Sequence, residues 1–290
     1  MKRVIYSIYI DVPETEHYAF SFDYEKEHNL KRSKLTRQNF ANHRDKLLQY
    51  KKKYCDKIGV PFKMYEYDEE YKTFSNNFLK NYPMFTKYEV VNFYKIHQLD
   101  KLSKHYDEIL YLDFDAIPVT EKSFFDNWNL SKGICVLHNN DRVSMNNFAR
   151  TQKSTRSPTA KYFNCQAMLI DSNKDPNNDV INTGIIGARK EDIKKLNFFE
   201  NFDDTINLMT KLIKEDNGLY PPNIQKSFRY DNETIFSYKT KMNNVDIQWL
   251  DNRWHYFFDI QYYIPKDTKI VHAINKDFDT VWRFCEKYNI

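Results

Sequence analysis

Hydrophobic and polar residues alternate with two different spacings along the chain. Short apolar runs rich in β-branched and aromatic residues predict strands over 4–10, 61–68, 109–112, 133–138, 162–170, 180–188, 245–249 and 269–272. Longer segments whose apolar residues recur every three or four positions predict helices over 42–58, 88–106, 124–128, 191–214, 231–238 and 282–288. The alternation of strands and helices in the first half is typical of an α/β fold, with parallel strands between two layers of helices.

Two polar segments interrupt this pattern. Residues 12–40 are polar and irregular, and we expect a long loop or insertion there. Residues 139–160 are polar and basic, and such a stretch in a compact domain is either functional, here a lid over an anionic ligand, or disordered. The chain shows no internal repeat and no linker, so we expect a single domain over residues 1–290.

The composition argues against several classes of function. A net charge of +4 on 290 residues is far weaker than the basic footprint of a dedicated nucleic-acid binder. The five glycines form neither a G-x-G-x-x-G nor a Walker A loop, which argues against classical dinucleotide and P-loop sites. The four cysteines form no C-x-x-C pair, as expected for free thiols in a reducing compartment. No stretch approaches the roughly 18 apolar residues of a membrane span, so we expect a cytoplasmic protein without one.

The strongest chemical signal is the pair Asp113 and Asp115, directly after the apolar run 109–112. Side chains two positions apart on an extended strand point the same way, so the two carboxylates repel each other unless a cation lies between them. Hard oxygen ligands of this kind hold a divalent cation, which in turn binds phosphate oxygens. A second Asp-Phe-Asp at 277–279 follows no apolar run and is interpreted as a solvated turn. The context of Asp113 and Asp115 therefore predicts a metal site at the end of a strand.

Three further motifs follow the two aspartates. They are the strand 181–187 (Ile-Asn-Thr-Gly-Ile-Ile-Gly), the segment 230–236 (Tyr-Asp-Asn-Glu-Thr-Ile-Phe) and His272 after a short apolar run. In this order the motifs resemble the GT-A glycosyltransferases, which are metal-dependent sugar-nucleotide enzymes, and most of all family 8-like and viral or bacterial relatives with a DxD motif. The resemblance implies the GT-A fold, a Rossmann-like three-layer α/β/α arrangement with a mixed, mostly parallel sheet.

The resemblance also implies a cofactor, Mn²⁺ or Mg²⁺, held by the two aspartates and His272 against the donor diphosphate. Around His272 the chain departs from the H-x-x-G-x-x-K pattern of the family, because Asn275 stands where Gly is expected and Phe278 where Lys is expected. Lys276 is then expected to reach the diphosphate instead.

Asp231, Asn232 and Glu233 are the catalytic candidates. Their segment resembles the D-Q-D-x-x-N segment of family 8, whose middle amide lies near the reacting anomeric carbon. Here Asn232 replaces Gln, and Phe236 replaces the trailing Asn. Alternatively, Asp231 or Glu233 corresponds to the carboxylate base that inverting enzymes use against the acceptor hydroxyl. The competing interpretation is ordinary capping of a helix by Asp231.

Further residues are expected to contact the nucleotide sugar. Lys95 lies on the helix where the family often places a basic residue facing the donor, although an exposed helix lysine is the competing interpretation. Asn182 would hydrogen-bond sugar hydroxyls, Gly184 would permit close backbone approach, and Gln166 on the predicted strand 162–170 would face the sugar. The positions expected to flank the nucleotide base are Tyr9, Asp11 and Asp68.

The sequence thus predicts an enzyme, a glycosyltransferase of class EC 2.4, which moves a sugar from a nucleotide sugar, with a UDP-sugar favoured, to a hydroxyl of a glycan, lipid or protein acceptor. We expect a nucleotide-binding half over about 1–118 and an acceptor and catalytic half over about 119–290. The alternatives are transfer to DNA bases, suggested by the basic segments 31–53 and 142–156, a metal-dependent nuclease or phosphohydrolase, and a non-catalytic binding module. The run Lys51-Lys52-Lys53 is interpreted as a solvated helix face.

Overall fold

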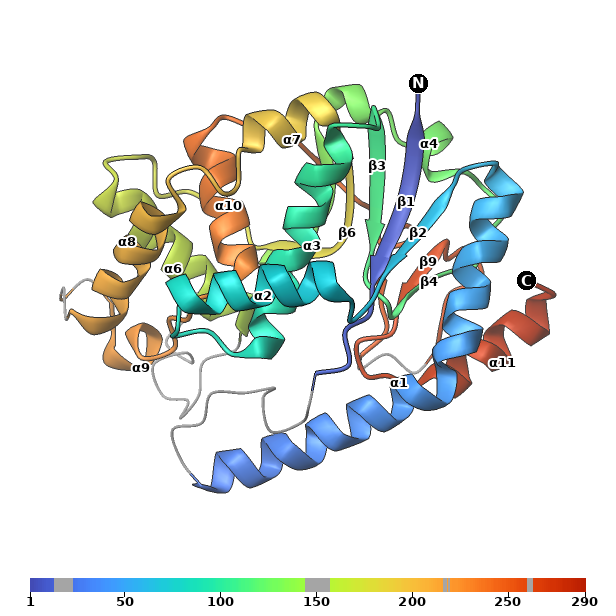
Figure 1. Cartoon of the computed structure of the whole chain (residues 1–290), viewed down its shortest axis with the longest axis horizontal. Coiled ribbons are helices and arrows are strands. Elements are labelled where there is room, and N and C mark those ends of the chain that lie inside the picture. Colours follow the sequence, from blue (N-terminus) through green and yellow to red (C-terminus); the bar gives the residue numbers. More distant parts are fainter. Residues whose placement is uncertain (13–22, 144–156, 216–217, 219, 260–262) are drawn as a thin grey trace.

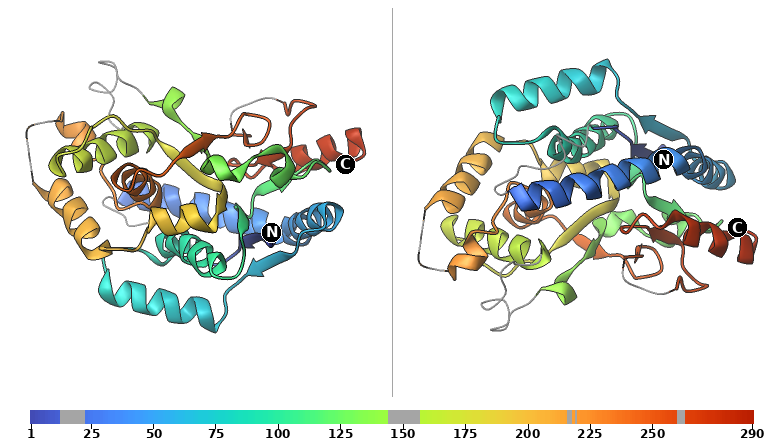
Figure 2. Two further views of the ribbon diagram at one scale, coloured as in Figure 1. Left: turned by 90° about the horizontal axis from the view of Figure 1, so that it is seen from above. Right: turned by 90° about the horizontal axis from the view of Figure 1, so that it is seen from below.

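The chain folds into two β-sheets flanked by helices (Figures 1 and 2). The structure is a computed structural model that describes residues 1–12, 23–143, 157–215, 218, 220–259 and 263–290. A six-stranded central sheet has the order β2-β1-β3-β6-β5-β7, and a three-stranded sheet has the order β4-β9-β8. The strands are β1 (Arg3–Ile8), β2 (Phe62–Tyr65), β3 (Glu108–Leu112), β4 (Ala116–Pro118), β5 (Ile134–His138), β6 (Ile181–Arg189), β7 (Ile247–Trp249), β8 (Tyr256–Phe257) and β9 (Ile270–His272).

Helices cover both faces of the central sheet. The α-helices are α1 (Asp23–Ile58), α2 (Glu69–Asn81), α3 (Lys87–Ser103), α4 (Phe124–Asn127), α6 (Ser157–Asp171), α7 (Lys190–Leu196), α8 (Phe202–Lys214), α9 (Pro222–Gln225), α10 (Asn232–Met242) and α11 (Phe278–Tyr288). Two 3₁₀ turns, η2 (Leu130–Lys132) and η3 (Asn140–Arg142), flank β5. One face packs against α2, α3 and α6 to α10, and the other against the end of α1, α4 and η2. The predicted three-layer arrangement is therefore confirmed.

Successive side chains of each central strand point to opposite faces of the sheet and so contribute to two different hydrophobic cores. Val4 and Tyr6 of β1 are buried in the larger core, and Ile5 between them is buried in the core on the opposite face. Ile109 and Leu110 of β3 divide in the same way. Because both faces are covered by helices, these strands read in the sequence as continuous apolar runs.

The central sheet is mixed. Strands β1, β2 and β3 run parallel to one another, and β7 runs parallel to β5, whereas β6 is antiparallel to both of its neighbours, β3 and β5. The predicted mixed sheet, with most pairings parallel, is therefore confirmed. Because β1 and β3 are parallel, the residues that follow them, Tyr9 to Asp11 and Asp113, lie at the same edge of the sheet.

The small sheet brings the end of the chain to this edge. Strand β4 starts directly after Asp115 and pairs with the antiparallel β9, so that Ala116 lies opposite His272. A third core, which includes Leu47 of α1, Val271 of β9 and Phe278 of α11, packs around this sheet. The register of β4 and β9 thus places His272 beside the two aspartates.

The structure corrects two predictions of secondary structure. The segment 162–170 is not a strand but part of α6, whose buried residues, including Ala160, Asn164 and Met168, repeat every four positions. Periodicity alone does not distinguish a short apolar run in a strand from one in a buried helix. The expected loop over 12–40 is also wrong for the part that the structure describes, because α1 begins at Asp23.

The missed half of α1 has a clear reason. The segment 23–41 contains many helix-forming residues, such as Glu, Lys, Arg and Leu, but few apolar residues at helical spacing. Figure 1 shows this half of α1 running beneath the rest of the molecule, and the side chains of residues 34–41 are exposed or half-buried. In the polar segment 139–160, residues 144–156 lie outside the described residues, so neither interpretation of that segment is tested.

None of the helices in the described part of the chain is both long enough and apolar enough to cross a membrane.

Candidate functional site

The two aspartates lie on a tight turn between the two sheets. Strand β3 ends at Leu112, and the turn closes when the backbone N–H of Ala116 donates to the carbonyl oxygen of Asp113 at 2.9 Å. The Asp115 side chain is buried, whereas that of Asp113 retains 27% of its exposure. The turn therefore leaves one carboxylate partly exposed and buries the other.

His272 completes a group of three side chains that could hold a metal ion, called the metal-binding group below. Its Nε2 atom lies 3.6 Å from Oδ2 of Asp113 and 3.4 Å from Oδ1 of Asp115. The ligand atoms of the three residues all lie within 4.8 Å of one another. Two carboxylates and an imidazole are a suitable donor set for Mn²⁺ or Mg²⁺. The residues present therefore fit a divalent cation.

A second histidine, which the sequence analysis missed, orients His272. The Nε2 atom of the buried His255 lies 2.8 Å from Nδ1 of His272. Burial, and next the neighbouring His272, hold the pKa of His255 well below its usual value, so that His255 is neutral. A His272 that binds metal through Nε2 would carry its proton on Nδ1 and donate it to His255. Nothing in the sequence around His255 distinguishes it from an ordinary core histidine.

Gly184 makes room for the His272 ring. A Cβ atom on residue 184 would lie 2.2 Å from Cε1 and 2.8 Å from Nδ1 of His272. The carbonyl oxygen of Gly184 also accepts a hydrogen bond of 2.7 Å from the backbone N–H of Asp113. The close approach expected at this glycine is thus to the histidine ring and to the turn that carries the aspartates.

Two lysines contact the aspartates. The Nζ atom of Lys95, which is only 4% exposed, lies 3.6 Å from Oδ1 of Asp113. Lys276 forms an ion pair with Oδ2 of Asp115. Burial alone would raise the pKa of Asp115, but Lys276 and His272 outweigh burial and hold that pKa below its usual range. The interpretation of Lys95 as an exposed helix lysine is therefore wrong.

Lys51 is a further residue of the site that the sequence analysis missed. Its side chain is fully buried, and its Nζ atom donates to the carbonyl oxygens of Asp113, at 2.9 Å, and of Ala116. Burial lowers the pKa of Lys51 to about 7. The residue lies four positions after the buried Leu47, on the inner stripe of α1, and this spacing is the signal that could have identified it. The run 51–53 is thus not a uniformly solvated face.

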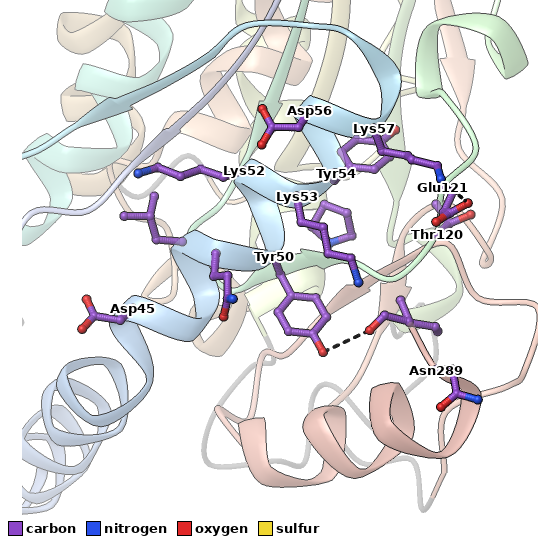
Figure 3. Close-up of a pocket in the computed structure, with 14 residues that line it drawn as sticks. Asp45, Tyr50, Lys52, Lys53, Tyr54, Asp56, Lys57, Thr120, Glu121 and Asn289 are labelled. Carbon is purple, nitrogen blue, oxygen red and sulfur yellow. Dashed lines mark hydrogen bonds and ion pairs between the residues drawn. The ribbon is translucent and has the colours of Figure 1, made fainter.

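The other two lysines of the run are exposed, as expected. Lys52 and Lys53 line a separate surface hollow of about 870 Å³ between α1, the segment after β4 and the last two residues (Figure 3). In this hollow Lys57 pairs with Glu121 at 3.1 Å, and the Tyr50 hydroxyl donates to the carbonyl of Ile290 at 3.5 Å. The predicted metal residues do not line it.

The metal-binding group lies in a cavity of about 290 Å³ at the carboxyl ends of β1 and β3. Asn182, Lys95 and Lys276 also line this cavity. The rings of Tyr9 and Phe114, which also line the cavity, lie 4.7 Å apart. Asp11 forms hydrogen bonds of 2.8 and 3.0 Å with Arg37 of α1. The structure thus brings together most of the expected metal and donor residues.

Two predicted donor residues lie elsewhere. Asp68 is the N-cap of α2, where its side chain accepts a hydrogen bond from the backbone N–H of Tyr71. Gln166 lies on α6, and its Oε1 atom accepts a hydrogen bond of 3.1 Å from the Tyr220 hydroxyl. Neither residue lines the cavity that holds the metal-binding group.

The three catalytic candidates lie at the start of α10. Asp231 is its N-cap, and the Asp231 side chain accepts hydrogen bonds from the backbone N–H groups of Glu233 and Thr234. Asn232 is buried, and its Nδ2 atom donates to Oγ1 of Thr183 on β6 at 2.9 Å. The capping interpretation of Asp231 is thus confirmed, and the same cap turns this segment toward β6.

Glu233 and Asp231 differ in their surroundings. Oε1 of Glu233 accepts hydrogen bonds from Nδ2 of Asn182 at 3.0 Å and from the backbone N–H of Thr183 at 2.9 Å, while Oε2 pairs with Lys161. Burial would raise the pKa of Glu233, but Lys161 outweighs it and the pKa is lowered. Burial raises the pKa of Asp231, against the opposing charge of Lys161.

The second Asp-Phe-Asp supports the role of sequence context. Asp277 is the N-cap of α11, and its side chain accepts a hydrogen bond of 3.1 Å from the backbone N–H of Thr280. The Asp279 side chain is 71% exposed. The two acidic side chains are exposed as expected, but they begin a helix instead of forming a turn, and Phe278 between them is buried.

Comparisons with known proteins find matches among solved structures only. No protein-family model and no curated protein matches the chain. A glycosyltransferase involved in the glycosylation of the major capsid of PBCV-1 matches with 13% identity and a TM-score of 0.42 over 100% of both chains. The galactosyltransferase LgtC, in complex with donor and acceptor sugar analogs, matches with 11% identity and a TM-score of 0.47 over 98% of this chain and 94% of that one. Mouse xyloside xylosyltransferase 1 matches with 10% identity and a TM-score of 0.39 over 97% of this chain and 99% of that one. These structures are glycosyltransferases, the class of enzyme that the sequence resembles.

Proposed function

We propose that this protein is a divalent-metal-dependent glycosyltransferase that moves a sugar from a nucleotide sugar, with a UDP-sugar favoured, to a hydroxyl acceptor. The observation that carries the proposal is the group Asp113, Asp115 and His272 in a cavity at the carboxyl ends of two parallel strands. Lys95 and Lys276 line the same cavity, and their ammonium groups suit the oxygens of a diphosphate.

Different residues of the cavity would contact different parts of the nucleotide-sugar donor. A bound Mn²⁺ or Mg²⁺, held by Asp113, Asp115 and His272, would supply Lewis-acid stabilisation of the departing nucleotide diphosphate. Tyr9 and Asp11 line the cavity, where the Tyr9 ring would stack on the nucleotide base and Asp11 would accept a hydrogen bond from the nucleoside. Asn182 would bond to hydroxyls of the donor sugar.

Asp231 is the better of the two carboxylates as general base in an inverting reaction. Both carboxylates accept hydrogen bonds on both oxygens, but Glu233 also forms a close ion pair with Lys161 and its pKa is lowered, so it is the weaker base. The raised pKa of Asp231 suits proton transfer better. The acceptor hydroxyl would lose its proton to Asp231 as its oxygen bonds to the anomeric carbon. The bond from that carbon to the diphosphate oxygen would break at the same time, with the electron pair leaving on the diphosphate. Asn232 would then be a neighbour that orients the segment.

The test measures Mn²⁺-dependent hydrolysis of a panel of UDP- and GDP-sugars without acceptor. Hydrolysis is detected as the release of UDP or GDP. Asp115→Asn should abolish hydrolysis, because the variant loses a charged ligand of the metal. Asp279→Asn makes the same change in the second Asp-Phe-Asp and should leave hydrolysis unchanged. Full activity of Asp115→Asn would overturn the metal assignment, and wild-type protein inactive on the whole panel would overturn the function.

A metal-dependent nuclease or phosphohydrolase has less support. Two-metal hydrolysis needs carboxylates around a second ion. Within the described residues, Asp113, Asp115 and His272 are the one group of three or more side chains that could hold a metal.

A further inference from the structure

A second hollow lies directly beside the metal cavity. It has a volume of about 400 Å³ and is enclosed by α3, α6 and the start of α10. Asn92 lines both hollows, and so marks where they meet. A hydrogen-bonded row that runs from Asn182 through Glu233 to Lys161 forms the wall between them, because Asn182 lines the metal cavity and Lys161 lines the second hollow.

The lining of this hollow carries two carboxylates and two cationic side chains. The carboxylates of Glu89 and Asp231 are acceptors, and they are balanced by the cations Lys161 and Arg229. The balance of charges suits an uncharged ligand. A phosphate, which offers acceptors and negative charge, would meet the two carboxylates unfavourably. The ring of Phe93 adds an apolar surface.

The side chain of Asn164 gives independent evidence that the hollow has a ligand, because its amide oxygen lacks a hydrogen-bond donor among the described residues. Its side chain is 1% exposed and lines the hollow. Its Nδ2 atom donates to the carbonyl oxygen of Arg229 at 2.9 Å, whereas its Oδ1 atom has no hydrogen-bond partner among the described residues. An amide oxygen buried without a donor is costly, and a ligand hydroxyl would supply that donor.

We propose that this hollow binds the acceptor of the reaction as an uncharged pyranose, one of whose hydroxyls donates to Oδ1 of Asn164. The inference rests on the proposed glycosyl transfer. Asp231 lines this hollow and is absent from the lining of the metal cavity. A base that takes a proton from the acceptor must touch the acceptor, so the position of Asp231 assigns the acceptor to this side of the wall. The donor then occupies the metal cavity, and its anomeric carbon faces the junction at Asn92.

The experiment compares Asn164→Leu, which removes the amide at nearly constant volume, with Asn178→Leu. Asn178 is 3% exposed, and its Nδ2 atom donates to backbone carbonyls. Its Oδ1 atom also finds no partner in the part of the chain that the structure describes, but the residue does not line this hollow. Binding of methyl glucoside, galactoside, mannoside and xyloside pyranosides is followed by ligand-observed NMR without donor. Transfer to the glycosides that bind is then measured with the active donor and Mn²⁺.

We expect at least one glycoside to bind wild-type protein and Asn178→Leu alike. Asn164→Leu should raise the Kd and the acceptor KM of that glycoside by roughly tenfold, the worth of one hydrogen bond. Asn178→Leu should hydrolyse the donor without acceptor at the wild-type rate. Equal affinity in both variants, or the absence of glycoside binding to the wild type, would overturn the acceptor site. Failure of the proposed function is seen separately, as absence of donor hydrolysis in the wild type.

Discussion

Gly184→Ala tests whether the packing of β6 against His272 sets the metal site. A Cβ at this position would lie 2.2 Å from Cε1 of His272, roughly 1.3 Å short of the normal contact distance of about 3.5 Å. The ring is also held on Nδ1 by His255 at 2.8 Å, so its retreat would break this hydrogen bond or move Nε2. Metal–ligand distances tolerate only about 0.2 Å. Loss of an orienting partner typically lowers metal affinity by about 10- to 100-fold, or about 1.4–2.7 kcal/mol. We therefore expect a decrease of this size.

The assay is a titration with Mn²⁺ in the presence of UDP, followed by electron paramagnetic resonance of free Mn²⁺. Gly187→Ala is the matched control, because a Cβ at residue 187 on the same strand would lie 2.5 Å from the Phe124 ring, away from the metal group. Overpacking should cost both variants about 1–3 kcal/mol of stability, which thermal unfolding measures. Only Gly184→Ala should lose Mn²⁺ affinity. Wild-type affinity in this variant, or an equal loss in both, would refute the argument.

Two further predictions concern charged residues of the site. Lys51→Met should weaken Mn²⁺ binding by about tenfold, because the backbone carbonyls of Asp113 and Ala116 lose their buried hydrogen-bond donor. Lys52→Met should bind Mn²⁺ as the wild type does. Equal effects of the two substitutions in the same titration would contradict this prediction. The pKa of Lys51 in the folded protein is lowered to about 7, so above that pH the unfolded chain binds one more proton than the folded chain. The free energy of unfolding of the wild type should therefore rise relative to that of Lys51→Met from pH 7 to about 10, by at most ~1.4 kcal/mol per pH unit. The lowered pKa of Glu233 stabilises the folded protein in a different pH range. This stabilisation is complete above the pKa of Glu233 in the unfolded chain, about 4.5, and is lost as the pH falls through its pKa in the folded protein. Urea unfolding from pH 6 to 3 should therefore show a shallower loss for Glu233→Gln, and parallel curves would exclude the contribution.

The fold was predictable where local pattern and tertiary burial agree. Strands such as β1 and β3 are buried on both faces, so their apolar runs are unambiguous in the sequence. The helix α6 was predicted as a strand because its apolar run is short. A buried strand has an apolar run of the same kind. The first half of α1 was missed because its sequence has few apolar residues at helical spacing and so carries no periodic signal.

The site divides in the same way. Asp113 and Asp115 were identified because their position after a strand is local information. His255 and Lys51 act through contacts with residues distant in the chain, and a single sequence contains no pattern that pairs them. Gly184 was noticed as a site of close approach, but its partner, the ring of His272, depends on the register of β4 and β9.

The two lysines beside the aspartates have a consequence for the order of binding. Lys95 and Lys276 already balance the two negative charges of Asp113 and Asp115. A divalent cation entering alone would leave this small, partly buried volume with two excess positive charges, which a low-dielectric environment opposes. A nucleotide diphosphate brings the compensating negative charge. Cation and nucleotide should therefore bind synergistically, each raising the affinity for the other by the same factor. The chain would thus behave as a receptor for the metal–nucleotide complex more than for the free ion.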